Sequence, residues 1–212
     1  MPKEIDRDEV QRLLAEGAQL VEVLPREEFE EEHLPGAINM PLRRLESMGF
    51  TQVHDYVAGK LDWLAAGLPS EGPMARLPRA GDVARKDVPT CEMAERLGDV
   101  RERVRAAGWN VCVVVNEERI VLGLLRQREL DGDADLTIER AMRPGPSTFR
   151  PHVGIQEMAS FMVEHGQESS PITTSEGLLI GILFREDAER EAHRIHELLH
   201  QHHGDEESGH AG

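Results

Sequence analysis

The chain has 212 residues, 39% of them hydrophobic, which is enough to bury the core of one medium domain or of two small ones. Its 40 acidic and 24 basic residues give a formal net charge of −16, which disfavours binding to nucleic acid and to anionic membranes. No run of about 18 apolar residues occurs, and the N-terminus has no apolar signal region. We therefore expect a cytoplasmic protein without a membrane span.

Residues 1–72 alternate between short helical and extended patterns. We expect helices at 9–17, 26–34, 42–50 and 59–67, and strands at 19–24, within 35–41, and at 51–57. Such alternation is typical of an α/β segment with a parallel sheet. The stretch 67–82 then concentrates proline and glycine, and we place a linker at 73–82.

Residues 83–190 contain an internal repeat with an offset of 58 residues, with copies at about 83–135 and 136–190. LGDVRERVRAAG (97–108) aligns with IQEMASFMVEHG (155–166), and VCVVVNEERIVLGLL (111–125) aligns with SSPITTSEGLLIGIL (169–183). Each copy is predicted to run strand, helix, strand, tight turn, strand and helix. A constant offset over nearly the whole unit favours two equivalent α+β copies that pack on each other.

The motif HLPGAINMP (33–41) resembles the part of a rhodanese domain that leads to its catalytic loop. LVEVLPREEF (20–29) and DYVAGKLDWLAAGLP (55–69) resemble the neighbouring segments, so the resemblance covers residues 4–71. In that family a central strand, a cysteine loop and a helix follow the first motif. Here that middle part is missing.

This gap has two consequences for the rhodanese-like segment. The only cysteines, Cys91 and Cys112, lie in the repeat region, so we expect no sulfurtransferase activity, because the reaction needs a thiolate nucleophile. The sheet would also lack a central strand, which leaves apolar flanks and an unpaired edge.

The repeat resembles a tandem pair of CBS domains, known as a Bateman module. LTIERAMRPGPSTFRP (136–151) is similar to the beginning of a second CBS repeat, and GLLIGILFRED (177–187) to its end. The resemblance covers about residues 80–190. It implies two repeats packed by their sheets, a regulatory ligand such as AMP, ATP or S-adenosylmethionine in the clefts, and assembly into homodimers.

The nucleotide signature of that family is incomplete in both copies. It reads GLLRQRE (123–129), where Arg126 and Glu129 replace a hydroxyl residue and an aspartate, and GILFRED (181–187), which keeps Asp187. The resemblance implies that Asp187 accepts hydrogen bonds from a ribose, so a surviving site would use the second copy. The alternative is that Asp187 is a solvated carboxylate at a helix start.

Other positions are candidates for the rest of such a ligand. The resemblance places Thr148 beside an adenine pocket, with Thr90 as its counterpart in the first copy, although both also suit ordinary strand positions. Five arginines are candidates to neutralise phosphates, while each alone also suits a surface position: Arg126, Arg128, Arg143, Arg150 and Arg185.

The C-terminal part, residues 191–212, is rich in histidine. We expect one helix from about residue 184 to residue 203, then disorder over 204–212. HELLH (196–200) matches the zinc-protease pattern H-E-x-x-H, but a zincin also needs a third ligand and a cleft. We therefore expect a solvated helix without a metal, and tolerance of truncation after Arg190.

Together these patterns predict a non-catalytic regulatory protein. It would consist of an incomplete rhodanese-like α/β segment followed by tandem CBS repeats, acting on a protein target that the sequence does not identify. The alternatives are a ligand-free dimerisation scaffold and an enzyme with residual sulfur chemistry or a zinc site.

Overall fold

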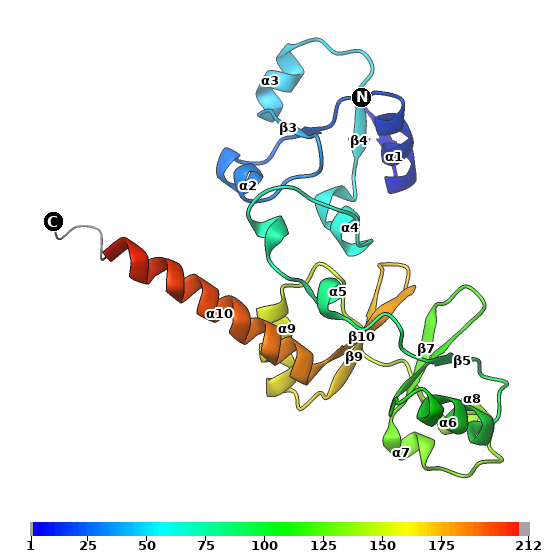
Figure 1. Cartoon of the computed structure of the whole chain (residues 1–212). Helices are drawn as coiled ribbons and strands as arrows, with labels where there is room; N and C mark the ends of the chain where they lie inside the picture. The colour runs from blue at the N-terminus through cyan, green and yellow to red at the C-terminus, as the bar shows by residue number, and fades with distance from the viewer. Residues whose placement is uncertain (1, 208–212) are drawn as a thin grey trace. The chain divides into compact units, whose positions relative to one another are not determined.

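The computed structural model describes residues 2–207, except for the side chains of residues 42, 46 and 199–207. The chain divides into two compact units, Met1–Leu77 and Pro78–Gly212 (Figure 1). No helix among the described residues is long and apolar enough to cross a membrane.

The first unit contains the alternating elements that the sequence predicts. In chain order these are β1 (Lys3–Ile5), α1 (Arg7–Ala15), β2 (Val21–Glu22), α2 (Arg26–Glu31), β3 (Ile38–Asn39), α3 (Leu42–Ser47), β4 (His54–Tyr56), α4 (Gly59–Ala65) and the short 3-10 helix η1 (Met74–Arg76). Strand β1 and the helix η1 are additional to the elements expected from the sequence.

The strands of the first unit pair in parallel, as the alternation predicts, but they form two separate sheets. β1 pairs with β4, and β2 pairs with β3. No strand in the described part of this unit joins the two pairs. This is the arrangement expected of a sheet that has lost its central strand, because the flanking pairs then have nothing to bridge them.

A small core nevertheless holds the first unit together. Val10, Leu34, Trp63 and Leu64 are buried against one another. The segment after α4 is tied back, because the indole N–H of Trp63 donates to the carbonyl oxygen of Pro69 at 2.8 Å. Large apolar side chains remain more than 40% exposed, as expected for a sheet that lacks a strand: Val23, Ile38, Met48, Phe50, Val57 and Leu61.

The second unit contains the two copies and their flanking helices. Before and within the first copy lie α5 (Ala80–Val83), β5 (Thr90–Cys91), α6 (Leu97–Ala106), β6 (Cys112–Val115), β7 (Val121–Leu125) and α7 (Gln127–Leu130). The second copy comprises α8 (Ile138–Ala141), β8 (Arg143–Pro144), α9 (Ile155–Glu164), β9 (Ser169–Thr173) and β10 (Leu179–Phe184), and it is followed by α10 (Arg185–Glu207).

The offset of 58 residues is reproduced in three dimensions. Helices α6 and α9 begin and end 58 residues apart, and the hairpins β6–β7 and β9–β10 follow them at corresponding positions. Gly108 and Gly166 end these helices with φ of 76° and 61°, a conformation that glycine adopts without strain. The copies differ at their first strand. In the second copy, no strand is formed at the position that corresponds to β5.

Each copy pairs its last strand with the segment that leads into the other copy. β7 pairs with β8 in a four-stranded sheet of order β5-β6-β7-β8. At the corresponding place in the second copy, Arg85 bridges Ile182 of β10 through two backbone hydrogen bonds of 2.8 and 3.0 Å. The two copies are therefore linked twice through their backbones.

Apolar residues of both copies meet in a shared core. Val113, Leu124 and Ile182 are completely buried there, and each copy also has a cluster under its own helix. Helix α5 belongs to this unit, because Ala80 is fully buried in the cluster under α9. The second unit thus begins inside the segment 73–82 that we expected to be a linker.

Helix α10 is the long C-terminal helix that the sequence predicts, and it packs on α9 (Figure 1). It continues to Glu207, so the expectation of disorder is wrong for 204–207, while 208–212 lie outside the described residues. Ile195 is buried in the core of the second copy, which argues against the expectation that residues 191–212 are dispensable for folding.

Replacing Ile195 with alanine is expected to lower the free energy of unfolding by about 2 kcal/mol, because it removes buried methyl groups and leaves a cavity. Leu198→Ala is the matched control on the same helix, since Leu198 is 46% exposed, and should change stability by less than about 0.5 kcal/mol. Urea unfolding of both variants measures the difference. Equal, small effects would mean that α10 does not contribute to the core.

Candidate functional site

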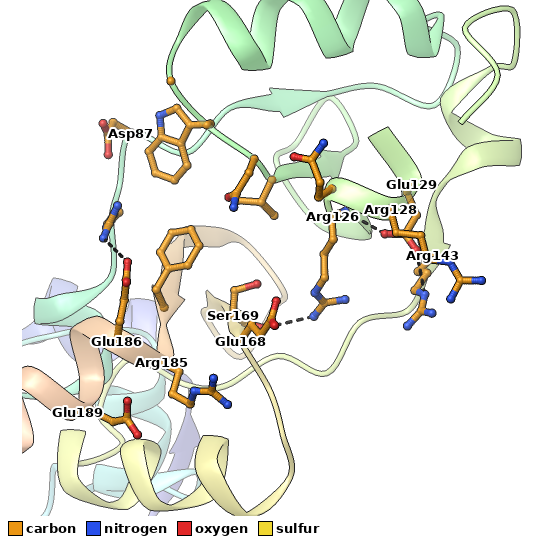
Figure 2. A pocket seen from close by; sticks show the side chains of 17 residues that line it. Asp87, Arg126, Arg128, Glu129, Arg143, Glu168, Ser169, Arg185, Glu186 and Glu189 are labelled. Carbon is orange, nitrogen blue, oxygen red and sulfur yellow. Dashed lines mark hydrogen bonds and ion pairs between the residues drawn. The ribbon is translucent and has the colours of Figure 1, made fainter. Parts of the chain in front are cut away.

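A cavity of about 990 Å³ lies within the second unit and is bordered by both copies (Figure 2). Its walls come from the loops before β6 and β9, from the ends of β7 and β10 with the helix starts that follow, and from the leading segments of both copies. The lining residues are Arg85, Asp87, Gly108, Trp109, Asn110, Val111, Arg126, Gln127, Arg128, Glu129, Arg143, Glu168, Ser169, Phe184, Arg185, Glu186 and Glu189.

Two ion pairs at corresponding positions join the copies beside this cavity. Arg143 Nε lies 3.1 Å from a carboxylate oxygen of Glu129, and Arg85 Nε lies 2.7 Å from one of Asp187. The offset of 58 residues relates Arg85 to Arg143 and Glu129 to Asp187. In each pair, therefore, the carboxylate that closes one copy binds the arginine that leads into the other copy. We call these two pairs the clasps.

Asp187 is almost completely buried, with 6% of its side chain exposed, and it binds both Arg85 and Arg190. Burial alone would raise the pKa of this carboxyl, but the hydrogen bonds from Arg85 and Arg190 outweigh it and hold the pKa below its usual value. Asp187 is therefore an ionised structural partner of two arginines in this structure.

Replacing Asp187 with asparagine is expected to change the acid stability of the second unit. A carboxyl whose pKa is lowered by folding stabilises the fold above its unfolded pKa of about 3.9, and this stabilisation is lost as the pH falls through the lower folded pKa. The stability difference between wild type and Asp187→Asn should thus be largest near pH 7 and shrink below about pH 4. Urea unfolding at several pH values tests this, and a pH-independent difference would contradict it.

The other arginines of the cavity are engaged to different degrees. The guanidinium of Arg126 donates to the carbonyl oxygen of Ser169 at 3.2 Å, which connects the first copy to β9. The backbone N–H of Arg126 donates to Glu129 at 3.1 Å. For Arg128 and Arg185, the described residues provide no side-chain ion pair within 4.0 Å. Two cations at the cavity are thus left without a carboxylate partner in that part of the chain.

Aromatic side chains form another part of the cavity wall. The rings of Trp109 and Phe184, one from each copy, have centroids 6.1 Å apart and are inclined by 36°. The guanidinium carbon of Arg85 lies 4.7 Å from the centroid of the Phe184 ring, which is a cation–π contact. A flat apolar surface therefore adjoins the charged groups.

The structure brings together three of the six site residues proposed from the sequence. Arg126, Glu129 and Arg185 line the cavity, as do Arg128 and Arg143. Asp187, Thr148 and Thr90 do not line it.

The positions outside the cavity wall have other partners. The carbonyl oxygen of Thr90 accepts a hydrogen bond from Arg103 at 3.2 Å, so this strand residue is tied to α6. Arg150 likewise points elsewhere, because it donates to the hydroxyl of Thr173 at 2.5 Å and to the carbonyl oxygen of Thr174 at 2.6 Å.

Sequence reasoning missed Arg85, Trp109 and Ser169 as residues of the site. The sequence could have predicted Arg85 as a site residue, because the offset of 58 residues relates it to Arg143, which is one of the candidate arginines. Trp109 and Ser169 carry no such signal, since nothing in a single sequence shows that loops of different copies face one cavity.

Among the residues whose side chains the structure describes, neither the histidines of α10 nor the cysteines form a second site. Within residues 2–198, whose side chains are described apart from those of 42 and 46, no group of three His, Cys, Asp or Glu residues is placed to hold a metal. His193 pairs with Glu197 at 3.2 Å, while the side chain of His200 lies outside the description. Cys91 and Cys112 are both buried in the core of the first copy.

Comparison with known families matches one segment in each unit of the chain. Residues 6–62 match the rhodanese-like domain, and residues 80–131 match the CBS domain. The rhodanese match is short, in agreement with the gap after HLPGAINMP.

A curated relative, an uncharacterized protein of Methanopyrus kandleri, is 30% identical over 115 residues, which are 50% of this chain and 59% of that protein. The chain thus matches less than two thirds of its length.

Solved structures show the fold of the second unit. The cytosolic domain of the Mg²⁺ channel MgtE in complex with ATP is similar at 22% identity with a TM-score of 0.50, over 55% of this chain and 50% of that one. CBSX2 in complex with AMP is similar at 19% identity with a TM-score of 0.50, over 56% of this chain and 98% of that one. CBSX2 from Arabidopsis thaliana is a CBS-pair protein, so the second unit has the fold of a CBS pair.

Proposed function

We propose that this chain, which carries a rhodanese-like domain followed by a CBS domain, is a non-catalytic regulatory protein that senses an adenine nucleotide or another adenosyl compound. The observation that carries the proposal is the cavity of about 990 Å³ between the two copies, because its volume suits a small molecule of nucleotide size. The similarity to structures bound to ATP and AMP supports this ligand class.

The clasps supply a route from ligand binding to a change of shape. Asp187 remains our candidate acceptor for the ribose hydroxyls, although it does not line the cavity while Arg85 and Arg190 bind it. A ribose that binds Asp187 has to displace Arg85, which leads into the first copy. Ligand binding would then favour a different arrangement of the two copies, and this shift would be read by a protein target.

Isothermal titration calorimetry of the full chain with AMP, ATP and S-adenosylmethionine tests the proposal. We expect saturable binding of at least one of them, weakened at least about tenfold by Asp187→Ala, because a charge-assisted hydrogen bond is worth about 1.5–3 kcal/mol. Asp135→Ala is the control, since Asp135 pairs with Arg96 on the surface and is 89% exposed. No binding of any of the three compounds would overturn the proposal.

The rival function is a ligand-free dimerisation scaffold, and the exposed apolar side chains of the first unit favour a protein contact. We propose that the chain forms a homodimer in either case. Light scattering would then give twice the chain mass of 23.7 kDa, and a monomer at micromolar concentration would contradict this.

A further inference from the structure

The two ends of the cavity correspond in sequence but differ in charge. The offset of 58 residues relates Arg126 to Phe184 and Arg128 to Glu186. We call the group at α7 and β8 the basic half, formed by Arg126, Gln127, Arg128, Glu129 and Arg143. We call the group at the start of α10 and the leading segment of the first copy the acidic half, formed by Arg85, Asp87, Phe184, Arg185, Glu186 and Glu189.

The residues assigned to the basic half include three arginines and one carboxylate, Glu129, which is engaged by Arg143. A further carboxylate of the cavity, Glu168, lies beside Ser169 and belongs to neither half. Arg126 donates to a backbone carbonyl, and Arg128 is exposed at the rim. Figure 2 shows Arg128, Arg143 and Glu129 grouped on one side of the cavity, with the side chain of Arg126 extending toward Ser169. This half therefore keeps an excess of positive charge in a chain whose net charge is −16.

The acidic half has three carboxylates against two arginines, and one of these arginines is committed to a clasp. Arg85 binds Asp187 and also lies 3.3 Å from Glu186, so little of its charge is available to a ligand. Figure 2 shows Asp87, Glu186 and Glu189 on the side of the cavity opposite to Arg128 and Arg143. The aromatic pair of Trp109 and Phe184 includes a residue of this half.

We infer that the cavity binds one nucleoside polyphosphate in one direction, with its phosphates at Arg126, Arg128 and Arg143 and its base toward Trp109 and Phe184. This inference rests on the proposed function and narrows its ligand class. Several phosphates match several guanidinium groups, each of which binds phosphate oxygens through charge-assisted hydrogen bonds. The aromatic rings offer a stacking surface, and the nearby carboxylates accept hydrogen bonds from the amino group of a base.

The same charge pattern disfavours the other candidate ligands. S-adenosylmethionine carries a sulfonium, an ammonium and a single carboxylate group where a nucleotide carries phosphates, so two of these three charged groups would be repelled by the arginines of the basic half. AMP places only one phosphate among three guanidinium groups. A second nucleotide in the opposite direction would bring its phosphates to Asp87, Glu186 and Glu189, so the corresponding halves do not make two equal sites.

Calorimetry with ATP, ADP and AMP on the full chain tests the inference with a matched pair of variants. Arg128→Glu reverses a charge of the basic half, whereas Arg140→Glu makes the same change at an exposed residue that does not line the cavity. For wild type we expect one ATP per chain, bound at least about tenfold more tightly than AMP. Arg128→Glu should weaken ATP at least about tenfold and bring the ATP-to-AMP ratio close to one, and Arg140→Glu should leave both within about twofold.

The direction of the ligand is read from Trp109 fluorescence. In a Trp63→Phe background, Trp109 is the remaining tryptophan, because the chain has two. ATP should change its emission, whereas inorganic tripolyphosphate should compete with ATP and leave the emission unchanged.

The outcomes separate this inference from the proposed function. Equal affinities for ATP and AMP with no effect of Arg128→Glu would overturn the inference and leave nucleotide sensing in place. Tripolyphosphate binding that depends on Arg128, without binding of any adenosyl compound, would support the anion site and overturn nucleotide sensing. Two ATP molecules per chain would also overturn the inference.

Discussion

Replacing Gly181 with alanine is expected to lower the free energy of unfolding of the second unit by about 3 kcal/mol. A Cβ atom on Gly181 would lie 2.7 Å from the carbonyl oxygen of Arg85. That oxygen accepts a hydrogen bond from the backbone N–H of Ile182, so the contact is with a held backbone and not with a movable side chain. The methyl group would force apart β10 and the segment that leads into the first copy, and with them the Arg85–Asp187 clasp.

Gly123 provides the matched control, because the offset of 58 residues makes it the counterpart of Gly181. Its added Cβ would meet first the Sδ atom of Met142, the far end of a flexible side chain, and then the carbonyl oxygen of Arg143 at 3.1 Å. Met142 can adopt another rotamer, so Gly123→Ala should cost about 1 kcal/mol. Urea unfolding of both variants measures the contrast, and equal losses would show that the backbone at Arg85 yields as easily as a methionine.

The full chain is expected to show no thiosulfate:cyanide sulfurtransferase activity. The rhodanese-like unit contains no cysteine, and losing the nucleophile of an enzyme that depends on one costs on the order of 10⁶-fold in turnover. The two cysteines of the second unit are poor substitutes. The hydrogen bond with Cys112 and burial both raise the pKa of Cys91 above its usual value, so its reactive thiolate form is scarce at neutral pH.

The control for this prediction is the double variant Cys91→Ser, Cys112→Ser. Its background rate should equal that of wild type, since neither thiol is exposed to the reagents. A wild-type turnover well above this background would mean that one of the buried thiols becomes accessible, and the assignment as a non-catalytic protein would then fail.

The repeat is the part of the fold that the sequence predicts best. The apolar spacing of α6 and α9 and the glycines that end them are local signals, and the constant offset of 58 residues is visible when the sequence is aligned with itself. The elements of the rhodanese-like unit follow from the same kind of signal. The absence of a central strand from this unit also follows from the sequence, because the gap falls between two segments that resemble the rhodanese domain.

The sequence did not predict that the segment 73–82 and the C-terminal helix contribute to the core, because their patterns are polar or rich in proline and glycine. Ala80 and Ile195 are nevertheless buried. Neither stretch has a continuous apolar face in its sequence, and only the packing of α5 and α10 on α9 shows that these two residues belong to the core. Burial of one residue is a property of its neighbours in space, which a hydropathy pattern does not contain.

The sequence by itself determined the two copies, the absence of a cysteine from the rhodanese-like unit, and most of the arginines that line the cavity. Only the tertiary structure decided that Asp187 binds Arg85, that the rings of Trp109 and Phe184 approach each other, and that the corresponding halves carry opposite charge. The reason is distance along the chain, since Arg85 and Asp187 are 102 residues apart. A local pattern shows which residue types are present, whereas the partner that neutralises each charge is chosen by the fold.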